Sequence, residues 1–134
     1  MSGREKAETL YGCLTSRVQY DQRYYADPDN MPHESPTALG ALRDNLAICG
    51  GYSHTLRLLF EKAGIPCCNV AGNYFGETHM WNTAYLDGEW LWFDATSDRG
   101  ASKEKGFRHF ALKNLDSVYE WKQHDVDLLW QLTK

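Results

Sequence analysis

Residues 78–96 read THMWNTAYLDGEWLWFDAT, two runs of strand-forming residues joined by Asp87-Gly88. Aromatic and β-branched residues favour strands, and Asp-Gly between two such runs is typical of a two-residue hairpin turn. The pattern predicts one strand over Thr78–Leu86 and a second over Glu89–Ala95. This hairpin decides the fold, because it determines which side chains share one face of an antiparallel sheet.

A two-residue turn sets the register of the two strands. Leu86 then faces Glu89, and further along the hairpin Trp81 faces Asp94. Side chains alternate between the faces of a strand, so His79, two residues before Trp81, lies on the same face as Asp94. The two residues become diagonal neighbours, about 7–8 Å apart between Cα atoms and within reach of a side-chain hydrogen bond. Such a bond fixes the imidazole tautomer and directs the other ring nitrogen outward.

A core helix is expected upstream of the hairpin, with Cys49 at its N-terminal edge. Residues 50–63 begin with two glycines and carry apolar residues at helical spacing. If this end of the helix packs against the face that carries His79, the helix dipole and a neighbouring imidazolium favour the thiolate of Cys49. The glycines leave room for a substrate backbone, and the N–H of Cys49 can contribute to an oxyanion hole.

Each of these residues also has a structural interpretation. A cysteine before a helix, a histidine in an aromatic strand and an aspartate at a strand end are more often packing or turn residues than catalytic ones. The shared face, the helix N-terminus and the glycines agree on a single site. On the residues alone, a catalytic triad of Cys49, His79 and Asp94 and a set of structural residues remain equal alternatives.

The other three cysteines, Cys13, Cys67 and Cys68, are expected to be small buried hydrophobic residues. Adjacent cysteines rarely bond each other, and the chain has no CxxC pair, so neither a disulfide framework nor a common zinc pattern is indicated. A metal site built from Cys49, Cys67, Cys68 and His79 remains a weaker alternative. The expectation is that the protein uses no metal or cofactor.

The remaining segments carry weaker patterns. The expected elements are helices over residues 4–18 and 35–45, a loop over 20–36, short strands over 66–70 and 107–112, and a tail over 115–132. Asp27 and Asp29 resemble half of a calcium loop, but a solvated turn is expected because the motif's Gly and terminal Glu are missing. Trp121 and Trp130 are expected to anchor the tail to the body of the domain.

Length and composition favour one globular domain over residues 1–134. Its 43% hydrophobic content allows a core without metal or disulfide support. A net charge of −4 without a cluster of Lys and Arg argues against a nucleic-acid partner. No apolar run approaches the ~20 residues that span a membrane. The polar start is unlike a signal peptide, so a cytoplasmic location is expected if the chain is complete. If the chain is a domain of a longer protein, a secreted or cell-surface location is the alternative.

The same residues resemble the transglutaminase-like superfamily, the papain-related domains with a Cys–His–Asp triad. That family combines a cysteine that opens a helix, a hydrophobic helix ending in Gly-Ile, a His-x-Trp-Asn strand and a Trp-x-x-x-Asp-x-Thr strand. The matching stretches of this chain are Ala47–Ser53, Leu58–Ile65, Val70–Gly72, Thr78–Asn82 and Leu86–Thr96.

The resemblance implies an α+β fold of the papain-like, transglutaminase-core kind, with the nucleophile helix packed on an antiparallel sheet. It implies Cys49 as nucleophile, His79 as general base and acid, and Asp94 as the residue that orients His79. Trp81 and Asn82 resemble the family's packing and strand-anchoring positions. The side-chain donor to the oxyanion hole is left open among Tyr20, Gln22 and Tyr52.

The implied reaction is thiol-dependent acyl transfer on a peptide or protein amide through a thioester. Release to water gives a peptidase or deamidase, and release to a lysine-type amine gives a transglutaminase. The sequence does not choose between them, nor does it set the oligomeric state. The alternative is a catalytically idle protein-interaction module on the same fold.

Overall fold

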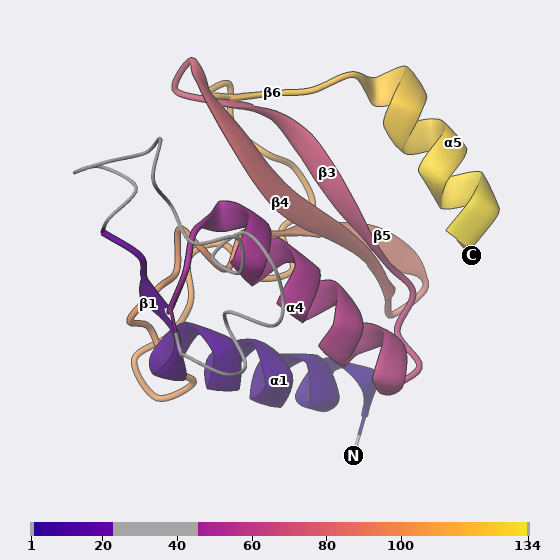
Figure 1. Ribbon diagram of the computed structural model, residues 1–134. Coiled ribbons are helices and arrows are strands. Elements are labelled where there is room, and N and C mark those ends of the chain that lie inside the picture. The colour runs from indigo at the N-terminus through magenta and orange to yellow at the C-terminus, as the bar shows by residue number, and fades with distance from the viewer. Residues whose placement is uncertain (1, 23–45, 134) are drawn as a thin grey trace.

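The computed structural model describes residues 2–22 and 46–133 (Figure 1). The expected helix over 35–45 and the Asp27/Asp29 turn lie outside these residues. In chain order the elements are α1 (Gly3–Arg17), β1 (Gln19–Tyr20), β2 (Leu46–Ala47), α4 (Cys49–Lys62), β3 (Cys67–Tyr74), β4 (Glu77–Leu86), β5 (Glu89–Phe93), β6 (Tyr119–Glu120) and α5 (Gln123–Thr133).

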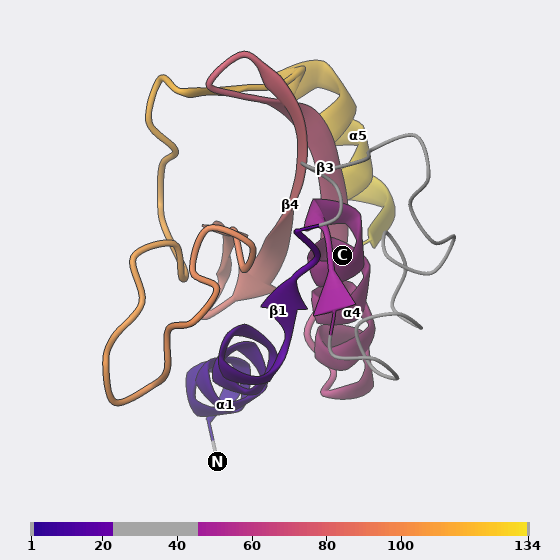
Figure 2. The ribbon, with the colours of Figure 1, turned by 60° about the vertical axis from the view of Figure 1, so that its left-hand side comes forward.

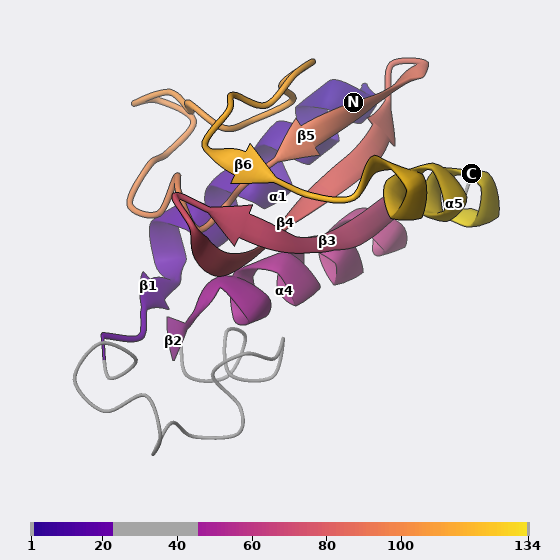
Figure 3. The same ribbon diagram turned by 90° about the horizontal axis from the view of Figure 1, so that it is seen from above.

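The main sheet is antiparallel, with strand order β5-β4-β3-β6. Figure 3 shows the strands from above, with α5 following β6 along the chain. Helices α1 and α4 lie together on one side of it, and α5 lies beside β3 (Figure 1). The α+β fold predicted from the sequence, with a helix packed on an antiparallel sheet, is confirmed.

The β4–β5 hairpin has the predicted register. Leu86 pairs with Glu89 and Tyr85 with Trp90 around a turn made only of Asp87 and Gly88. Both turn residues have positive φ angles, 54° and 83°, as a type I′ turn requires. The turn chemistry therefore sets which residues of the two strands share a face.

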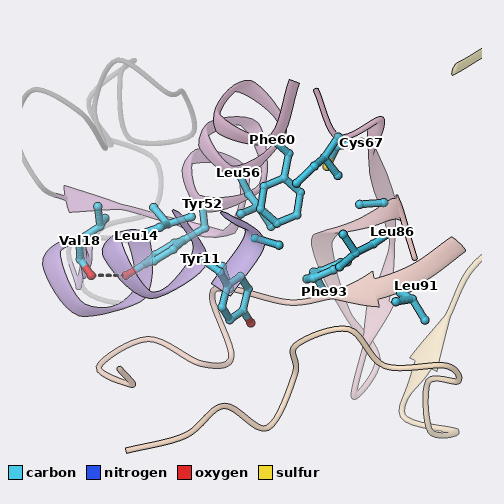
Figure 4. Packing of buried hydrophobic residues seen from close by; sticks show 14 of the residues in the cluster. Tyr11, Leu14, Val18, Tyr52, Leu56, Phe60, Cys67, Leu86, Leu91 and Phe93 are labelled. Carbon is cyan, nitrogen blue, oxygen red and sulfur yellow. Dashed lines mark hydrogen bonds between the residues drawn. The ribbon is translucent and has the colours of Figure 1, made fainter. Parts of the chain in front are cut away.

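The larger core lies between the sheet and the two helices α1 and α4 (Figure 4). In α4, Tyr52, Leu56 and Phe60 recur every four residues and are completely buried. They pack with α1 and with the inward-facing strand residues Ala84, Leu86, Leu91 and Phe93. The Tyr52 hydroxyl donates a hydrogen bond of 2.8 Å to the Val18 carbonyl, which also ties α4 to the end of α1.

A smaller, aromatic core lies on the opposite face of the sheet. Trp121 packs against Trp92 with ring centroids 5.0 Å apart, and Trp130 stacks on Trp90 at 5.7 Å. Trp130 also donates a hydrogen bond to Thr83. The prediction that Trp121 and Trp130 anchor the tail is confirmed, and the tail forms β6 and α5.

Two predicted strands differ from the structure. The strand expected over 66–70 extends to Tyr74, because Asn73 and Tyr74 pair with β6 as well as β4. The strand expected over 107–112 is wrong: Ala111 has a φ of 53°, which interrupts extended backbone, and only Leu112 bridges to Trp92.

A short parallel pairing was not anticipated. Gln19 and Tyr20 of β1 pair with Leu46 and Ala47 of β2, directly before Cys49. Two-residue strands carry too little alternation to be recognised in a sequence. The pairing brings the end of α1 beside the start of α4.

Asn82 fixes α4 to the sheet, in agreement with its predicted anchoring position. Its buried amide donates to the carbonyls of Ser53 in α4 and Cys68 in β3 and to the side chain of Asn69. The Ser53 hydroxyl in turn lies 3.0 Å from the Trp81 carbonyl. These bonds set how far the N-terminal half of α4 lies from the strand that carries His79.

The cysteines are free thiols in the structure. Cys67 and Cys68 are buried as predicted, and burial raises the pKa of both thiols. The prediction of a buried Cys13 is wrong, because this residue lies on the outward face of α1 and is exposed. Among the described residues, none of the helices is long and apolar enough to span a membrane.

Gly72 in β3 has no room for a side chain unless its neighbours move. A Cβ there would overlap the carbonyl oxygen of Glu120 in β6 and lie 2.8 Å from the ring of Trp81. We expect Gly72→Ala to lower the free energy of unfolding by about 1–3 kcal/mol, because β6 and its neighbours must move. Urea unfolding measures the change. Ala71→Ser, at the exposed neighbouring position, is the control, and equal stability of the two variants would contradict the packing constraint.

Candidate active site

The predicted nucleophile and base lie in one cavity of about 440 Å³. Three parts of the chain form its walls: the β1 and α4 ends, the β3–β4 hairpin, and the loop after β5, which runs along one side of the molecule (Figure 2). The lining residues are Tyr20, Ile48, Cys49, Tyr74, Phe75, Glu77, Thr78, His79, Thr96, Ser97 and Arg99.

Cys49 is the first residue of α4, as predicted. Ile48 is extended and precedes the helix without a side-chain cap, and the first turn contains no acidic residue. The positive end of the helix dipole is therefore not neutralised by a neighbouring carboxylate.

His79 and Asp94 form the hydrogen bond expected from the hairpin register. Nε2 of His79 lies 2.9 Å from Oδ2 of Asp94, whose side chain is 1% exposed. The other ring nitrogen, Nδ1, remains for the cavity, and a hydrogen bond between His79 and Cys49 contributes to the charge state of the imidazole. The structure thus brings together all three residues that the sequence singled out.

The route by which Cys49 reaches His79 differs from the expectation. Helix α4 packs on the face of the sheet formed by Ala84, Leu91 and Phe93. His79 and Asp94 belong to the opposite face, since side chains alternate along the strands. The β4–β5 pairing ends at Asn82 and Phe93, so His79 and Asp94 lie past its last pair, and the start of α4 approaches them at that open end.

His79 and Asp94 each stabilise the charged form of the other. Burial lowers the pKa of His79, but hydrogen bonds to Asp94 and Cys49 and the charge of Asp94 outweigh it and raise the pKa to about 9. Burial raises the pKa of Asp94, and the bonds from His79, Tyr119 and Ser97 together lower it below the usual value. At neutral pH the site therefore holds an imidazolium beside a carboxylate.

Asp94 has two further partners that sequence reasoning missed. Oδ2 of Asp94 accepts hydrogen bonds from the Tyr119 hydroxyl at 2.7 Å and from the Ser97 hydroxyl at 2.8 Å. Burial and the charge of Asp94 raise the pKa of Tyr119 well above its usual value, so the hydroxyl stays protonated and donates. Ser97 follows Asp94 closely in the chain and could have been considered as a turn residue. Tyr119 lies in the tail, where no local pattern indicated it.

Aromatic rings fix the plane of the imidazole. The ring of His79 stacks on Trp81, with centroids 5.9 Å apart, and contacts Tyr74 at 5.1 Å. Tyr119 packs against both Tyr74 and Trp81. Gly72 lies opposite His79 on β3, where a larger residue would meet Trp81. The imidazole is therefore positioned by packing as well as by its hydrogen bond to Asp94.

Of the three candidates for a side-chain oxyanion donor, Tyr20 lies in the cavity with Cys49. The β1–β2 pairing places it there, beside the residues that precede α4. The Tyr52 hydroxyl is buried and already donates to Val18, so Tyr52 is wrong as a candidate. Gln22 is exposed and does not line the cavity.

The alternative metal site is not assembled. Cys67 pairs with Ala84 at the opposite end of the β3–β4 ladder from His79, which pairs with Gly72. Five residues of strand correspond to about 17 Å. Within residues 2–22 and 46–133 there is no group of three or more His, Cys, Asp or Glu side chains that could hold a metal ion.

A second histidine–aspartate pair, His109 and Asp98, has a structural role. Asp98 accepts hydrogen bonds from the Tyr11 hydroxyl at 2.6 Å, from Nδ1 of His109 at 3.2 Å and from the backbone N–H groups of Arg108 and His109. None of these residues lines the cavity of Cys49. The cluster joins α1 to the loop after β5 and so supports the loop that carries Ser97.

The charge state of His79 gives a direct test. We expect the imidazole to titrate near pH 9, measured by NMR of labelled protein, and Asp94→Asn to lower this midpoint because its main stabilising charge is lost. Because the folded pKa of His79 is raised, the stability that its protonation contributes is complete below about pH 6.5 and is lost as the pH rises through about 9. A midpoint at or below 6.5 in the wild type would contradict the ion pair.

Tyr119→Phe tests the support of Asp94 from the tail. Loss of a hydrogen bond to a buried carboxylate is expected to lower the free energy of unfolding at pH 7 by about 1.5–3 kcal/mol. The control is Tyr74→Phe, whose hydroxyl has no hydrogen bond to the described residues although its ring packs in the same cluster. Urea unfolding should separate the two variants, and equal losses would rule out a special role of the Tyr119 hydroxyl.

Comparison with known proteins supports a family assignment. The sequence model of the transglutaminase-like superfamily matches residues 1–95. Kyphoscoliosis peptidase of Mus musculus is 26% identical over 111 residues, and that of Homo sapiens over 108 residues; the matches cover 74% and 72% of this chain. The chain spans only 16% of the length of each of these relatives.

Two solved structures share the fold. The crystal structure of a TGase superposes with a TM-score of 0.65 at 20% identity, over 88% of this chain and 32% of that one. A Cytophaga hutchinsonii protein provisionally described as a cysteine protease superposes with a TM-score of 0.56 at 19% identity, over 78% of this chain and 34% of that one. From its sequence match over residues 1–95, the chain belongs to the transglutaminase-like superfamily, and its fold agrees with this assignment.

Proposed function

We propose that the protein catalyses thiol-dependent acyl transfer on peptide or protein amides, with Cys49 as nucleophile, His79 as base and acid, and Asp94 as orienting residue. The observation that carries the proposal is the His79–Asp94 hydrogen bond, which leaves the second imidazole nitrogen in the cavity that Cys49 lines. Membership of the transglutaminase-like superfamily is consistent with this chemistry.

The reaction begins with attack of the Cys49 sulfur on an amide carbonyl. In this proposal the backbone N–H of Cys49, at the start of α4, stabilises the negative charge that develops on the carbonyl oxygen. His79 then donates its proton to the departing nitrogen, which leaves as ammonia or an amine, and the acyl group remains on Cys49 as a thioester. A raised pKa keeps His79 protonated for this step at neutral pH.

In the second half of the reaction His79 accepts a proton from the incoming nucleophile. Water releases an acid, as in a peptidase or deamidase, and a lysine-type amine releases a new amide, as in a transglutaminase. The cavity is lined by exposed polar residues such as Glu77 and Thr78, so water can enter it. We therefore favour hydrolysis, with transfer to an amine as the competing outcome.

Cys49→Ala should abolish the turnover of peptide amides and leave the exposed Cys13 as the main site of iodoacetamide labelling near neutral pH, as resolved by peptide mapping. The reason is that Cys49 alone among the four cysteines lies beside a histidine that is hydrogen-bonded to a carboxylate. Intact mass spectrometry after incubation with peptide pools detects a thioester on Cys49, and the peptides show the +1 Da change of deamidation.

The matched control is Cys67→Ala, which removes a buried thiol far from the cavity and should leave labelling intact. Equal labelling of the two variants would contradict the assignment of Cys49 as the reactive thiol. Rapid labelling of Cys49 without any thioester or product would favour the alternative, a protein-interaction module that keeps the residues of the triad.

A further inference from the structure

One wall of the active-site cavity carries a cation in addition to the imidazole. Arg99 is the only lysine or arginine among the described residues that line this cavity. It follows Asp94 by five residues, outside the segment matched by the family's sequence model. The cation stands out because the chain as a whole has a net charge of −4.

The guanidinium of Arg99 is held in place by two contacts. It lies over the ring of Tyr20, with 4.8 Å from its central carbon to the ring centroid, and Nη1 donates a hydrogen bond of 2.9 Å to the Thr96 carbonyl. A stacked and hydrogen-bonded guanidinium loses less side-chain freedom when it binds a ligand than a free one does. The β1–β2 pairing fixes the backbone of Tyr20, whose ring the guanidinium of Arg99 contacts.

The loop that carries Arg99 is also tied down. The N–H of Gly100 donates to the Thr15 carbonyl in α1, and the N–H of Arg99 donates to the Thr96 carbonyl. The adjacent Asp98 is buried and accepts four other hydrogen bonds. The position of the guanidinium is thus determined by the fold rather than by a free loop.

Within residues 2–22 and 46–133, no carboxylate lies at ion-pair distance from Arg99. The ion pairs in this part of the chain join Arg4 to Asp87, Arg57 to Glu61, His79 to Asp94 and His109 to Asp98. Among the described lining residues, the only carboxylate is Glu77, which lies on the β3–β4 hairpin and is not at ion-pair distance from Arg99. With respect to the part of the chain that the structure describes, the guanidinium therefore keeps donors for a ligand.

We propose that Arg99 is a carboxylate-binding subsite of the active-site cavity and selects substrates with an acidic group close to the reacting amide. The proposal rests on the proposed function, since it names the substrate class of the same site. A guanidinium matches a carboxylate in charge and in the geometry of its donors. An aspartate or glutamate side chain and the carboxylate of a peptide C-terminus share this chemistry. Glu77 repels an acidic group, so the substrate acid lies on the Arg99 side.

The first test uses small alkylating agents and does not require turnover. Iodoacetate and iodoacetamide both lose iodide to a cysteine sulfur, but only iodoacetate carries a carboxylate. The ratio of their rates at Cys49 is measured by peptide mapping, with the exposed Cys13 as internal reference. Removal of the Arg99 charge in Arg99→Gln should lower the ratio at Cys49 roughly threefold, and Arg99→Glu should lower it further.

Two variants control for structural effects. Arg99→Lys keeps the positive charge and should retain most of the iodoacetate-to-iodoacetamide rate ratio at Cys49. A purely structural role of the arginine side chain would not predict this retention. Arg108→Glu makes the same charge change outside the cavity and should leave the ratio unchanged. A ratio at Cys49 that is the same in the wild type, Arg99→Gln and Arg99→Glu would overturn the subsite, whether or not the protein turns over amides.

The second test uses peptides that contain one glutamine, with blocked termini and a flanking Glu, Gln or Lys. We expect the Glu peptide to have the highest kcat/KM, by roughly threefold or more over the Gln peptide, and Arg99→Glu to move the preference to Lys. A neutral peptide with a free or an amidated C-terminus separates the two sources of carboxylate. Equal kcat/KM for all peptides would leave the acyl-transfer function standing and overturn the subsite. If no peptide is turned over, the proposed function fails and the alkylation ratio alone decides on the subsite.

Discussion

The hydrogen bond between His79 and Asp94 is the interaction on which the rest of the site depends. It joins a strand of the sheet to the end of the next strand, and it forms beyond the last backbone pair of the β4–β5 hairpin. Without Asp94, the imidazole would be a buried base whose charged form is penalised by desolvation. With Asp94, the same burial strengthens the attraction between the two charges. The protein thus keeps a protonated histidine beside a cysteine at the start of a helix.

The sheet separates two hydrophobic cores that have different structural roles. The core on the side of α1 and α4 is mostly aliphatic, and it sets the position of the helix that begins with Cys49. The core on the other side consists largely of tryptophan and tyrosine and surrounds the imidazole. Asn82 and Ser53 connect the two through hydrogen bonds that cross from strand to helix. A shift in either core would therefore change the distance between the sulfur and the imidazole.

The sequence determined the His79–Asp94 pairing because a two-residue turn allows only one register, and alternation then assigns each side chain to a face. It also located the start of α4, since a helix with strong periodicity has recognisable ends. It could not show that Cys49 approaches His79 at the open end of the hairpin, because that depends on the packing of α4 against the opposite face. Tyr119 escaped detection for a related reason: its partner Asp94 is 25 residues away, and no local pattern encodes that contact. The β1–β2 pairing, which brings Tyr20 to the cavity, was too short to recognise.

The bond from Tyr119 to Asp94 also has a consequence for the order in which the site is completed. Protein synthesis releases the chain from its N-terminus, so the cysteine, the histidine and the aspartate of the proposed triad all emerge before the tyrosine that supports the aspartate. Until β6 has joined β3, the carboxylate lacks one of its hydrogen-bond donors, and the tyrosine ring is absent from the cluster around the imidazole. A nascent chain that already contains all three residues of the proposed triad therefore still lacks part of the site. The hydrogen bond from Tyr119 to Asp94 forms only once the C-terminal tail is in place. A fragment cut to residues 1–95, the part that matches the family's sequence model, would therefore lack this bond to the proposed orienting residue.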